Sequence, residues 1–141
     1  MLCNEIMKKT VECVRPDDDV RAAAKKMKNT NIGFIPVCED GKRVIGTITD
    51  RDIAMRIVAD GKPLETRARD VMTRDLITCR PGDDLKEAEE LMSKHKKSRI
   101  LCVDDQGKLE GVISLSDIAQ HEGRERAAQT FRAVTEREAR P

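Results

Sequence analysis

Two short motifs in the sequence place a glycine, a hydroxyl and an acid at the same spacing. Residues 46–52 read GTITDRD and residues 111–117 read GVISLSD, so both follow Gly-x-x-(Thr/Ser)-x-x-Asp. A Thr or Ser three residues before an acid at a helix start resembles a capping box, in which the side chains satisfy free backbone N–H groups. The alternative is half of a binding site used twice, and the motif alone leaves both interpretations open.

The composition limits the kind of protein that carries these motifs. The 141 residues suit one compact domain or two small halves, and with two Phe and no Trp or Tyr the core must be aliphatic. The 27 basic and 26 acidic residues nearly cancel, which argues against a protein that coats nucleic acid or an anionic membrane. No apolar run is long enough to span a bilayer, and MLCNEIMKKT does not resemble a signal peptide. We therefore expect a cytoplasmic protein with no membrane segment.

The cysteines and histidines suggest no catalytic or metal site. Five widely spaced cysteines without a C-x-x-C pair predict neither a disulfide framework nor a zinc site, and free Cys in apolar runs serves as a small buried hydrophobe. The two histidines, His95 and His121, provide no evident nucleophile partner or metal cluster. An enzyme or redox protein would rest on the thiols alone, so we expect a non-enzyme. The cysteines are Cys3, Cys13, Cys38, Cys79 and Cys102.

A gapless internal repeat organises most of the chain. Sliding the sequence by 65 residues places residues 6–56 on 71–121 with 14 identities in 51 positions, more than random pairing would give. The repeat predicts one supersecondary unit built twice. Neither copy has enough apolar residues to stand alone, so we expect the two to pack about a pseudo-twofold axis. We divide the chain into repeat 1 (1–62), repeat 2 (63–122) and a charged tail (123–141).

The hydrophobic periodicity predicts the same order of elements in each copy: strand, helix, strand, strand, helix. In repeat 1 these are strand 10–14, a helix with apolar positions from Val20 to Met27, strands 34–38 and 43–49, and a helix from Asp50. In repeat 2 they are strand 76–79, a helix containing Leu85, Ala88 and Met92, strands 99–103 and 109–114, and a helix from about Ser116. The tail is either a frayed, solvated segment or a helix with Ala127, Phe131 and Val134 on one stripe, docked on its own module or on a second copy.

These features together resemble a tandem pair of CBS domains, the Bateman module. The resemblance covers residues 1–122 and rests on the repeat and on a set of motifs. These are Glu5-Ile6-Met7-Lys8 with Asp70-Val71-Met72-Thr73, the Arg-Pro-x-Asp-Asp helix start, IPV before the hairpin turn, and GTITDRDIA with GVISLSDIA. It implies an α/β (α+β) fold with two repeats, and adenosine-containing ligands such as AMP, ADP, ATP, NAD or S-adenosylmethionine bound in two clefts between them. Such modules are sensors rather than catalysts.

The resemblance also implies roles for the motif residues. Asp52 and Asp117 match the acid that accepts hydrogen bonds from a ribose diol, and Thr49 and Ser114 match the hydroxyl that meets the first phosphate. Capping and binding use the same local geometry, so the two interpretations are compatible. Arg99 matches a phosphate-binding base, and arginine suits a phosphate because its planar fork donates two parallel hydrogen bonds.

The two sites are expected to be unequal. Repeat 1 has Gly33-Phe34 in place of Ser98-Arg99. The positive charge that binds a phosphate in its site would have to come from Arg51 or from Arg99 reaching across. The alternative to a phosphate-binding role is that residues 94–99 form a solvated basic face. The adenine contacts implied by the resemblance, through backbone or apolar atoms, are Cys13, Ile35, Pro36, Thr78, Ile100 and Leu101.

The leading hypothesis is therefore a regulatory module that binds an adenosine ligand, with no obligatory cofactor. A second hypothesis is a protein-interaction scaffold in which the motifs only cap helices. The resemblance implies a homodimer that signals to an effector protein by a conformational or assembly change. The lack of stacking aromatics makes single-stranded nucleic acid an unfavoured partner.

Overall fold

The computed structural model describes residues 1–121 and 123–138. Its contacts divide the chain into two compact units. One is continuous, Glu12–Leu76, and the other joins Met1–Val11 to the residues from Ile77 onward. The units therefore differ from the two sequence repeats, because the first eleven residues of repeat 1 pack with repeat 2.

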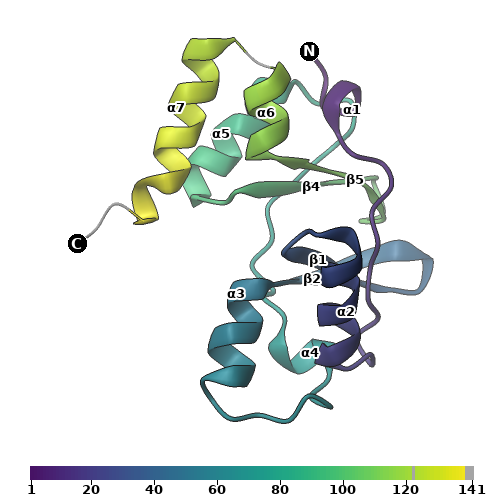
Figure 1. Cartoon of the computed structure of the whole chain (residues 1–141). Coiled ribbons are helices and arrows are strands. Elements are labelled where there is room, and N and C mark those ends of the chain that lie inside the picture. Colours follow the sequence, from purple (N-terminus) through teal and green to yellow (C-terminus); the bar gives the residue numbers. More distant parts are fainter. Residues whose placement is uncertain (122, 139–141) are drawn as a thin grey trace. The chain divides into compact units, whose positions relative to one another are not determined.

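Unit 12–76 is built around a hairpin, β1 paired antiparallel with β2 (Figure 1). Helix α2 packs its apolar face, Val20, Ala23 and Met27, into the same cluster as Ile35 and Ile48 of the hairpin. Asp19 caps the start of α2 by accepting a 2.9 Å hydrogen bond from the Ala22 N–H. The elements are α2 (Val20–Thr30), β1 (Phe34–Glu39), the 3₁₀ turn η1 (Asp40–Lys42), β2 (Arg43–Thr49), α3 (Asp50–Ile53), the π-helical turn η2 (Ala54–Val58) and α4 (Ala68–Val71).

The other unit repeats this plan and adds elements from both chain ends. A three-stranded sheet has the order β3-β4-β5, with β3 parallel to β4 and β4 antiparallel to β5. Helix α5 packs on it through Leu85, Ala88 and Met92. The elements are α1 (Cys3–Ile6), β3 (Thr78–Cys79), α5 (Leu85–His95), β4 (Arg99–Val103), β5 (Leu109–Ser114), α6 (Leu115–His121), α7 (Arg124–Thr135) and the 3₁₀ turn η3 (Glu136–Glu138).

The strands predicted for residues 43–49, 99–103 and 109–114 are confirmed, but the strand predicted for residues 10–14 is wrong. That segment keeps a single bridge, in which the Val14 N–H donates to Pro36 O and the Cys38 N–H donates to Val14 O. The next ladder bond upstream would need an N–H at position 36, and proline has none. In the other unit Leu101 stands at that position and donates to Ile77 O, so a short β3 forms there.

Residues 124–135 of the tail form helix α7, which lies beside α5 (Figure 1). Val134 is fully buried in the core of this unit and Ala127 packs against it, whereas Phe131 is 55% exposed. The apolar stripe proposed for the tail is therefore shifted: Thr130, not Phe131, lies on the buried face. The tail expected from the sequence, 123–141, includes residues 139–141, which lie outside the described residues.

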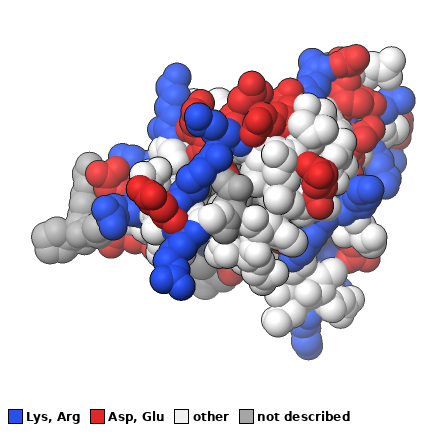
Figure 2. All heavy atoms as spheres, turned by 90° about the horizontal axis from the view of Figure 1, so that it is seen from above, with Lys and Arg blue, Asp and Glu red and all other residues white. Residues whose placement is uncertain are grey.

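Within the described ranges, no helix has both the length and the apolar character needed to cross a membrane. Lys and Arg side chains are interspersed with Asp and Glu on the face shown in Figure 2. Neither sign of charge covers that face continuously. This mixed distribution is what a formal net charge of +1 from 53 charged residues would give when spread over the surface.

Candidate functional site

The first hydroxyl–acid pair forms a capping box at the junction of β2 and α3. The Asp52 N–H donates to Thr49 Oγ1 at 3.1 Å, and the Thr49 N–H donates to Asp52 Oδ2 at 2.9 Å. Thr49 has extended backbone angles while Asp50 begins the helix, as an N-cap residue should. The capping interpretation of Thr49 and Asp52 is confirmed.

The second pair forms the same reciprocal bonds where β5 meets α6. The Ser114 N–H donates to Asp117 Oδ2 at 2.9 Å, and the Asp117 N–H lies 3.3 Å from Ser114 Oγ. Ser114 Oγ also donates to Asp117 Oδ2 at 2.9 Å and lies 2.8 Å from Ser116 Oγ. Asp117 is buried, with 7% of its surface exposed. Both motifs therefore hold a carboxylate at the helix start through one of its two oxygens.

The second oxygen of each acid faces a residue from the opening segment of the other repeat. In unit 12–76, Thr73 Oγ1 donates to Asp52 Oδ1 at 3.5 Å, and a guanidinium nitrogen of Arg56 lies 3.8 Å from the same oxygen. In the other unit, Lys8 Nζ lies 3.8 Å from Asp117 Oδ1. These long contacts leave Oδ1 with acceptor capacity for a further hydroxyl.

Thr73 and Lys8 occupy equivalent positions, 65 residues apart, directly after the shared residues Met72 and Met7. Their contacts have no local sequence pattern because each residue meets an acid of the other repeat. The available signal was the repeat itself, since it aligned Lys8 with Thr73 beside an identical methionine.

The glycine of each motif lets the opening segment approach. Thr47 and Thr73 exchange two backbone hydrogen bonds of 3.0 and 2.8 Å beside Gly46. A Cβ on Gly46 would lie 2.5 Å from Met72 Sδ, so a side chain at position 46 would displace the methionine. Lys8 and Val112 exchange the equivalent bonds beside Gly111. The spacing Gly-x-x-(Thr/Ser)-x-x-Asp, shared by the two repeats, thus places a glycine that admits the opening segment on the hairpin and an acid that faces its side chain at the start of the following helix.

The predicted phosphate end differs between the units, as the sequence suggested. Arg99 pairs directly with Ser114 across β4 and β5, so the two side chains share one face of the sheet. Phe34 pairs with Thr49 in the same register of the other hairpin. Arg51 is exposed on the first turn of α3. A cation therefore stands opposite the hydroxyl in one unit and an aromatic ring stands opposite it in the other.

The residues proposed to contact adenine divide into two groups. Ile35 and Ile100 are almost fully buried in the two cores, so they can offer a ligand backbone atoms only. Pro36 and Leu101 pair with Thr47 and Val112, and strand alternation directs them to the face opposite the two isoleucines. Thr78, paired with Leu101, is exposed.

Cys13 is the half-buried member of the cysteines and lies against Cys38. The Cys38 thiol donates to Cys13 Sγ at 3.1 Å, and Lys26 Nζ donates to the Cys13 carbonyl at 2.6 Å. The hydrogen bond from Cys38 lowers the pKa of Cys13, and the charges of Lys42 and Lys26 act in the same direction. The same hydrogen bond raises the pKa of Cys38. The four other cysteines are buried.

Comparison with known proteins identifies the repeats. Residues 3–59 and 68–123 match the family model described as CBS domain. The chain is 38% identical over 115 residues to the CBS domain-containing protein YhcV of Bacillus subtilis, covering 82% of this chain and 81% of that protein.

A solved structure has the same fold. The CBS domain pair of protein MJ0100, in complex with 5′-methylthioadenosine and S-adenosyl-L-methionine, superposes with a TM-score of 0.76 at 27% identity. The alignment covers 87% of this chain and 100% of that chain.

A further match is to part of an enzyme. The chain is 32% identical over 126 residues to the inosine-5′-monophosphate dehydrogenase of Methanocaldococcus jannaschii, covering 89% of this chain but 24% of the enzyme. The family model matches both repeats, which carry the hydroxyl–acid pairs, the opening segments and the shared glycines. The chain belongs to the CBS domain family and carries two copies of the domain in tandem.

Proposed function

We propose that this CBS pair is a regulatory module that binds an adenosine-containing small molecule of the AMP, ADP, ATP, NAD or S-adenosylmethionine class. The observation that carries the proposal is the shared geometry of Asp52 and Asp117. In each unit one carboxylate oxygen holds the helix start, and the other faces the opening segment at 3.5 to 3.8 Å. The two hydroxyls of a ribose diol can donate hydrogen bonds to such an oxygen.

The likeness to the MJ0100 pair supports the ligand class, because that protein is described in complex with two adenosine compounds. The difference between the units supports unequal sites. A phosphate-bearing ligand would favour the site with Arg99 opposite Ser114, since a guanidinium can donate two hydrogen bonds to a phosphate. The site with Phe34 opposite Thr49 suits a ligand with less negative charge.

Thermal unfolding with a panel of AMP, ADP, ATP, NAD and S-adenosylmethionine tests the proposal. A ligand at about a hundredfold over its dissociation constant stabilises the native state by about 2.7 kcal/mol, or several degrees in Tm. Asp117→Asn and Asp52→Asn are the informative variants because the amide oxygen of asparagine can still accept the Ser114 or Thr49 N–H, so the capping box is retained while the anionic acceptor is lost. Asp60→Asn, at an exposed position, is the matched control.

We expect a Tm shift in the wild type and in Asp60→Asn that is reduced in at least one of the two site variants. Binding that is unchanged in both site variants would contradict the role of the acids. The absence of a shift with every ligand at millimolar concentration would reject the proposed function.

A second candidate function is a protein-interaction scaffold. The observation in its favour is that both capping boxes are complete without a ligand. If the motifs only cap helices, Ser114→Ala costs about 1 kcal/mol of unfolding free energy and changes no ligand response.

A homodimer and an effector protein belong to the same proposal. Met55 and Val58 on the turn η2 are 52% and 72% exposed, which provides apolar surface for a second copy. Sedimentation analysis of Val58→Asp tests this surface. We expect a dimeric wild type and a shift of the variant toward monomer, and an unchanged mass would exclude this contact.

A further inference from the structure

The C-terminal segment contacts the loop that precedes β4. Arg137, in η3, donates one hydrogen bond to the Lys96 carbonyl and a second to Ser98 Oγ, both at 2.6 Å. Lys96 Nζ also lies 3.7 Å from a carboxylate oxygen of Glu136. Arg137 lies beyond residue 123, where the match to the CBS family model ends. This contact is therefore a feature of the chain rather than of the matched domain.

The loop that Arg137 contacts is joined to the proposed phosphate end. Ser98 immediately precedes Arg99, the residue opposite Ser114. The Ser98 carbonyl accepts a 3.0 Å hydrogen bond from the Leu115 N–H, directly after Ser114. Arg137 thus holds by its side chain a residue whose backbone is already bonded to the start of α6.

The equivalent loop of the other unit lacks this possibility. Gly33 accepts the matching hydrogen bond from the Asp50 N–H at 3.0 Å, but a glycine has no hydroxyl for a guanidinium to hold. A Cβ at Gly33 would lie 2.3 Å from Asp50 Oδ2, so a side chain at that position would displace the exposed Asp50 carboxylate. The hydroxyl at position 98 occurs in the unit that also has Arg99.

A simpler role for Arg137 is to cap α5. Lys96 ends that helix in a left-handed conformation, and a cation near the last carbonyls of a helix is favourable. Capping accounts for the hydrogen bond to the Lys96 carbonyl. It does not require the second bond to Ser98, which fixes the guanidinium one residue from Arg99.

We propose that Arg137 is a positioning residue that makes this site prefer ligands with phosphate groups over uncharged adenosine. The proposal rests on the proposed function above. The guanidinium fork holds Lys96 and Ser98 beside Arg99, and the part of its charge that Glu138, 3.5 Å from its Nε, does not offset adds to that of Arg99 at the anionic end of the ligand. The preference for ATP over adenosine should therefore fall when Arg137 is removed, because the missing charge interacts with the phosphates and not with the nucleoside.

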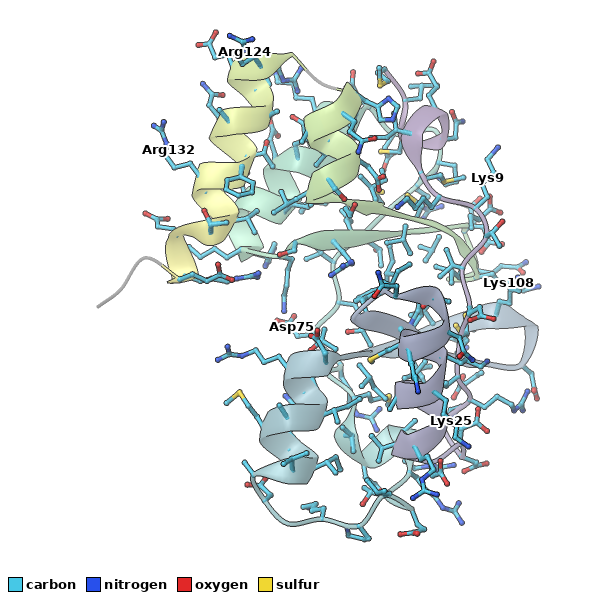
Figure 3. The ribbon with its side chains drawn as sticks, in the orientation of Figure 1. Lys9, Lys25, Asp75, Lys108, Arg124 and Arg132 are labelled. Atoms are coloured by element: carbon cyan, nitrogen blue, oxygen red, sulfur yellow. The ribbon has the colours of Figure 1, made fainter. Side chains whose placement is uncertain are left out.

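Titration calorimetry of the full chain with adenosine, AMP and ATP tests the inference. Arg137→Ala removes the fork and the charge, whereas Arg137→Lys keeps the charge on a different geometry. Arg132→Ala is the matched control, since Arg132 is an exposed arginine of α7 that projects away from the helix (Figure 3).

We expect Arg137→Ala to weaken ATP binding by about three- to tenfold and AMP binding by less, with the adenosine affinity unchanged. Arg137→Lys should lie between Arg137→Ala and the wild type. Raising the salt should shrink the difference, because charges near the surface are screened. Arg132→Ala should match the wild type for all three ligands.

The outcomes separate the two proposals. No binding of any of the three ligands to the wild type rejects the adenine-nucleotide form of the proposed function and this inference with it. Binding to the wild type with the same ratio of ATP to adenosine affinity in Arg137→Ala rejects the inference alone. An equal loss for adenosine and ATP would assign Arg137 to the stability of α5 and also overturn the inference.

Discussion

The carbonyl oxygen of Lys8 lies so close to Gly111 that a Cβ on this glycine would come within 2.9 Å of it. Gly111 therefore allows two backbones to approach, as the paired hydrogen bonds between Lys8 and Val112 require. The same Cβ would also lie 2.8 Å from Cγ and Sδ of Met7, whereas at Gly46 all three nearest atoms belong to the Met72 side chain. A methyl group at position 46 would therefore contact only a flexible side chain, whereas one at position 111 would also contact rigid backbone.

We predict that Gly111→Ala destabilises the protein by about 1–3 kcal/mol and costs more than Gly46→Ala. A methionine can change rotamer to accommodate a methyl group, but a backbone carbonyl held in a ladder cannot. Urea unfolding measures both free energies. Gly82→Ala is the control, since no atom lies within 4 Å of a Cβ built there. Equal costs at the three positions would show that the close approach is unimportant.

The C-terminal helix α7 should contribute to the core of its unit. We predict that Val134→Ala lowers the unfolding free energy by about 2 kcal/mol, because it removes buried methyl groups and leaves a cavity. Phe131→Ala removes a larger but exposed side chain from the same helix and should change it by much less. Chemical denaturation of the two variants decides the matter, and a larger loss for Phe131→Ala would mean that α7 presents its other face.

Acid stability should depend on Asp84, the N-cap of α5. Its carboxylate accepts a 2.9 Å hydrogen bond from the Lys86 N–H, which holds the pKa of Asp84 below its usual 3.8. The folded state favours the ionised form of Asp84. The stabilisation from this hydrogen bond is therefore complete above the pKa of Asp84 in the unfolded chain, and it is lost as the pH falls through the lower pKa of the folded state.

Asp84→Asn keeps a capping acceptor but cannot titrate. We predict that its unfolding free energy falls less steeply below about pH 4 than that of the wild type. Asp75→Asn, an exposed position labelled in Figure 3, serves as control. Denaturant midpoints between about pH 2 and pH 6 give both slopes, and identical acid profiles for wild type and Asp84→Asn would refute the assignment.

Cys13 should be the most reactive thiol. Its lowered pKa gives it more thiolate near neutral pH than a cysteine of ordinary pKa, and the other four cysteines are buried. The hydrogen bond with Cys102, together with burial, raises the pKa of Cys79 to about 12, which makes it unreactive. Brief iodoacetamide treatment followed by peptide mass analysis should therefore find Cys13 labelled first.

The donor to Cys13 can be tested separately. Cys38→Ala removes the hydrogen-bond donor, whereas Cys38→Ser retains one. We expect slower alkylation of Cys13 at neutral pH in the alanine variant than in the serine variant. The reverse order would mean that access to Cys13, not its pKa, controls the rate.

Much of the fold could be predicted because its signals are local. The apolar pattern of residues 43–49 and 109–114 gave the bounds of β2 and β5 directly. The segment 10–14 has an equally strand-like composition, yet its pairing depends on whether position 36 carries an N–H. Pro36 lies far away in the sequence, so the loss of that strand follows from tertiary pairing and not from local propensity.

The candidate site shows the same division. Thr49 and Asp52 are three residues apart, and their hydrogen bonds follow from that spacing. The contact of Lys8 with Asp117 joins the two ends of the repeated region and has no local pattern. The contact of Arg137 with Ser98 could not be predicted for a further reason, since Arg137 lies outside the repeat that aligned the other residues.

The placement of residues 1–11 has a consequence for the order of events during synthesis. Residues 12–76 form one continuous unit, so every partner of its internal contacts has been synthesised once residue 76 is made. The preceding segment must wait, because Cys3 and Lys8 bond to Asp83 and Val112, which are translated much later. The residues made before residue 12 thus complete their native contacts only after those of unit 12–76, and a stalled chain would expose Ile6 and Met7 until the second repeat is synthesised.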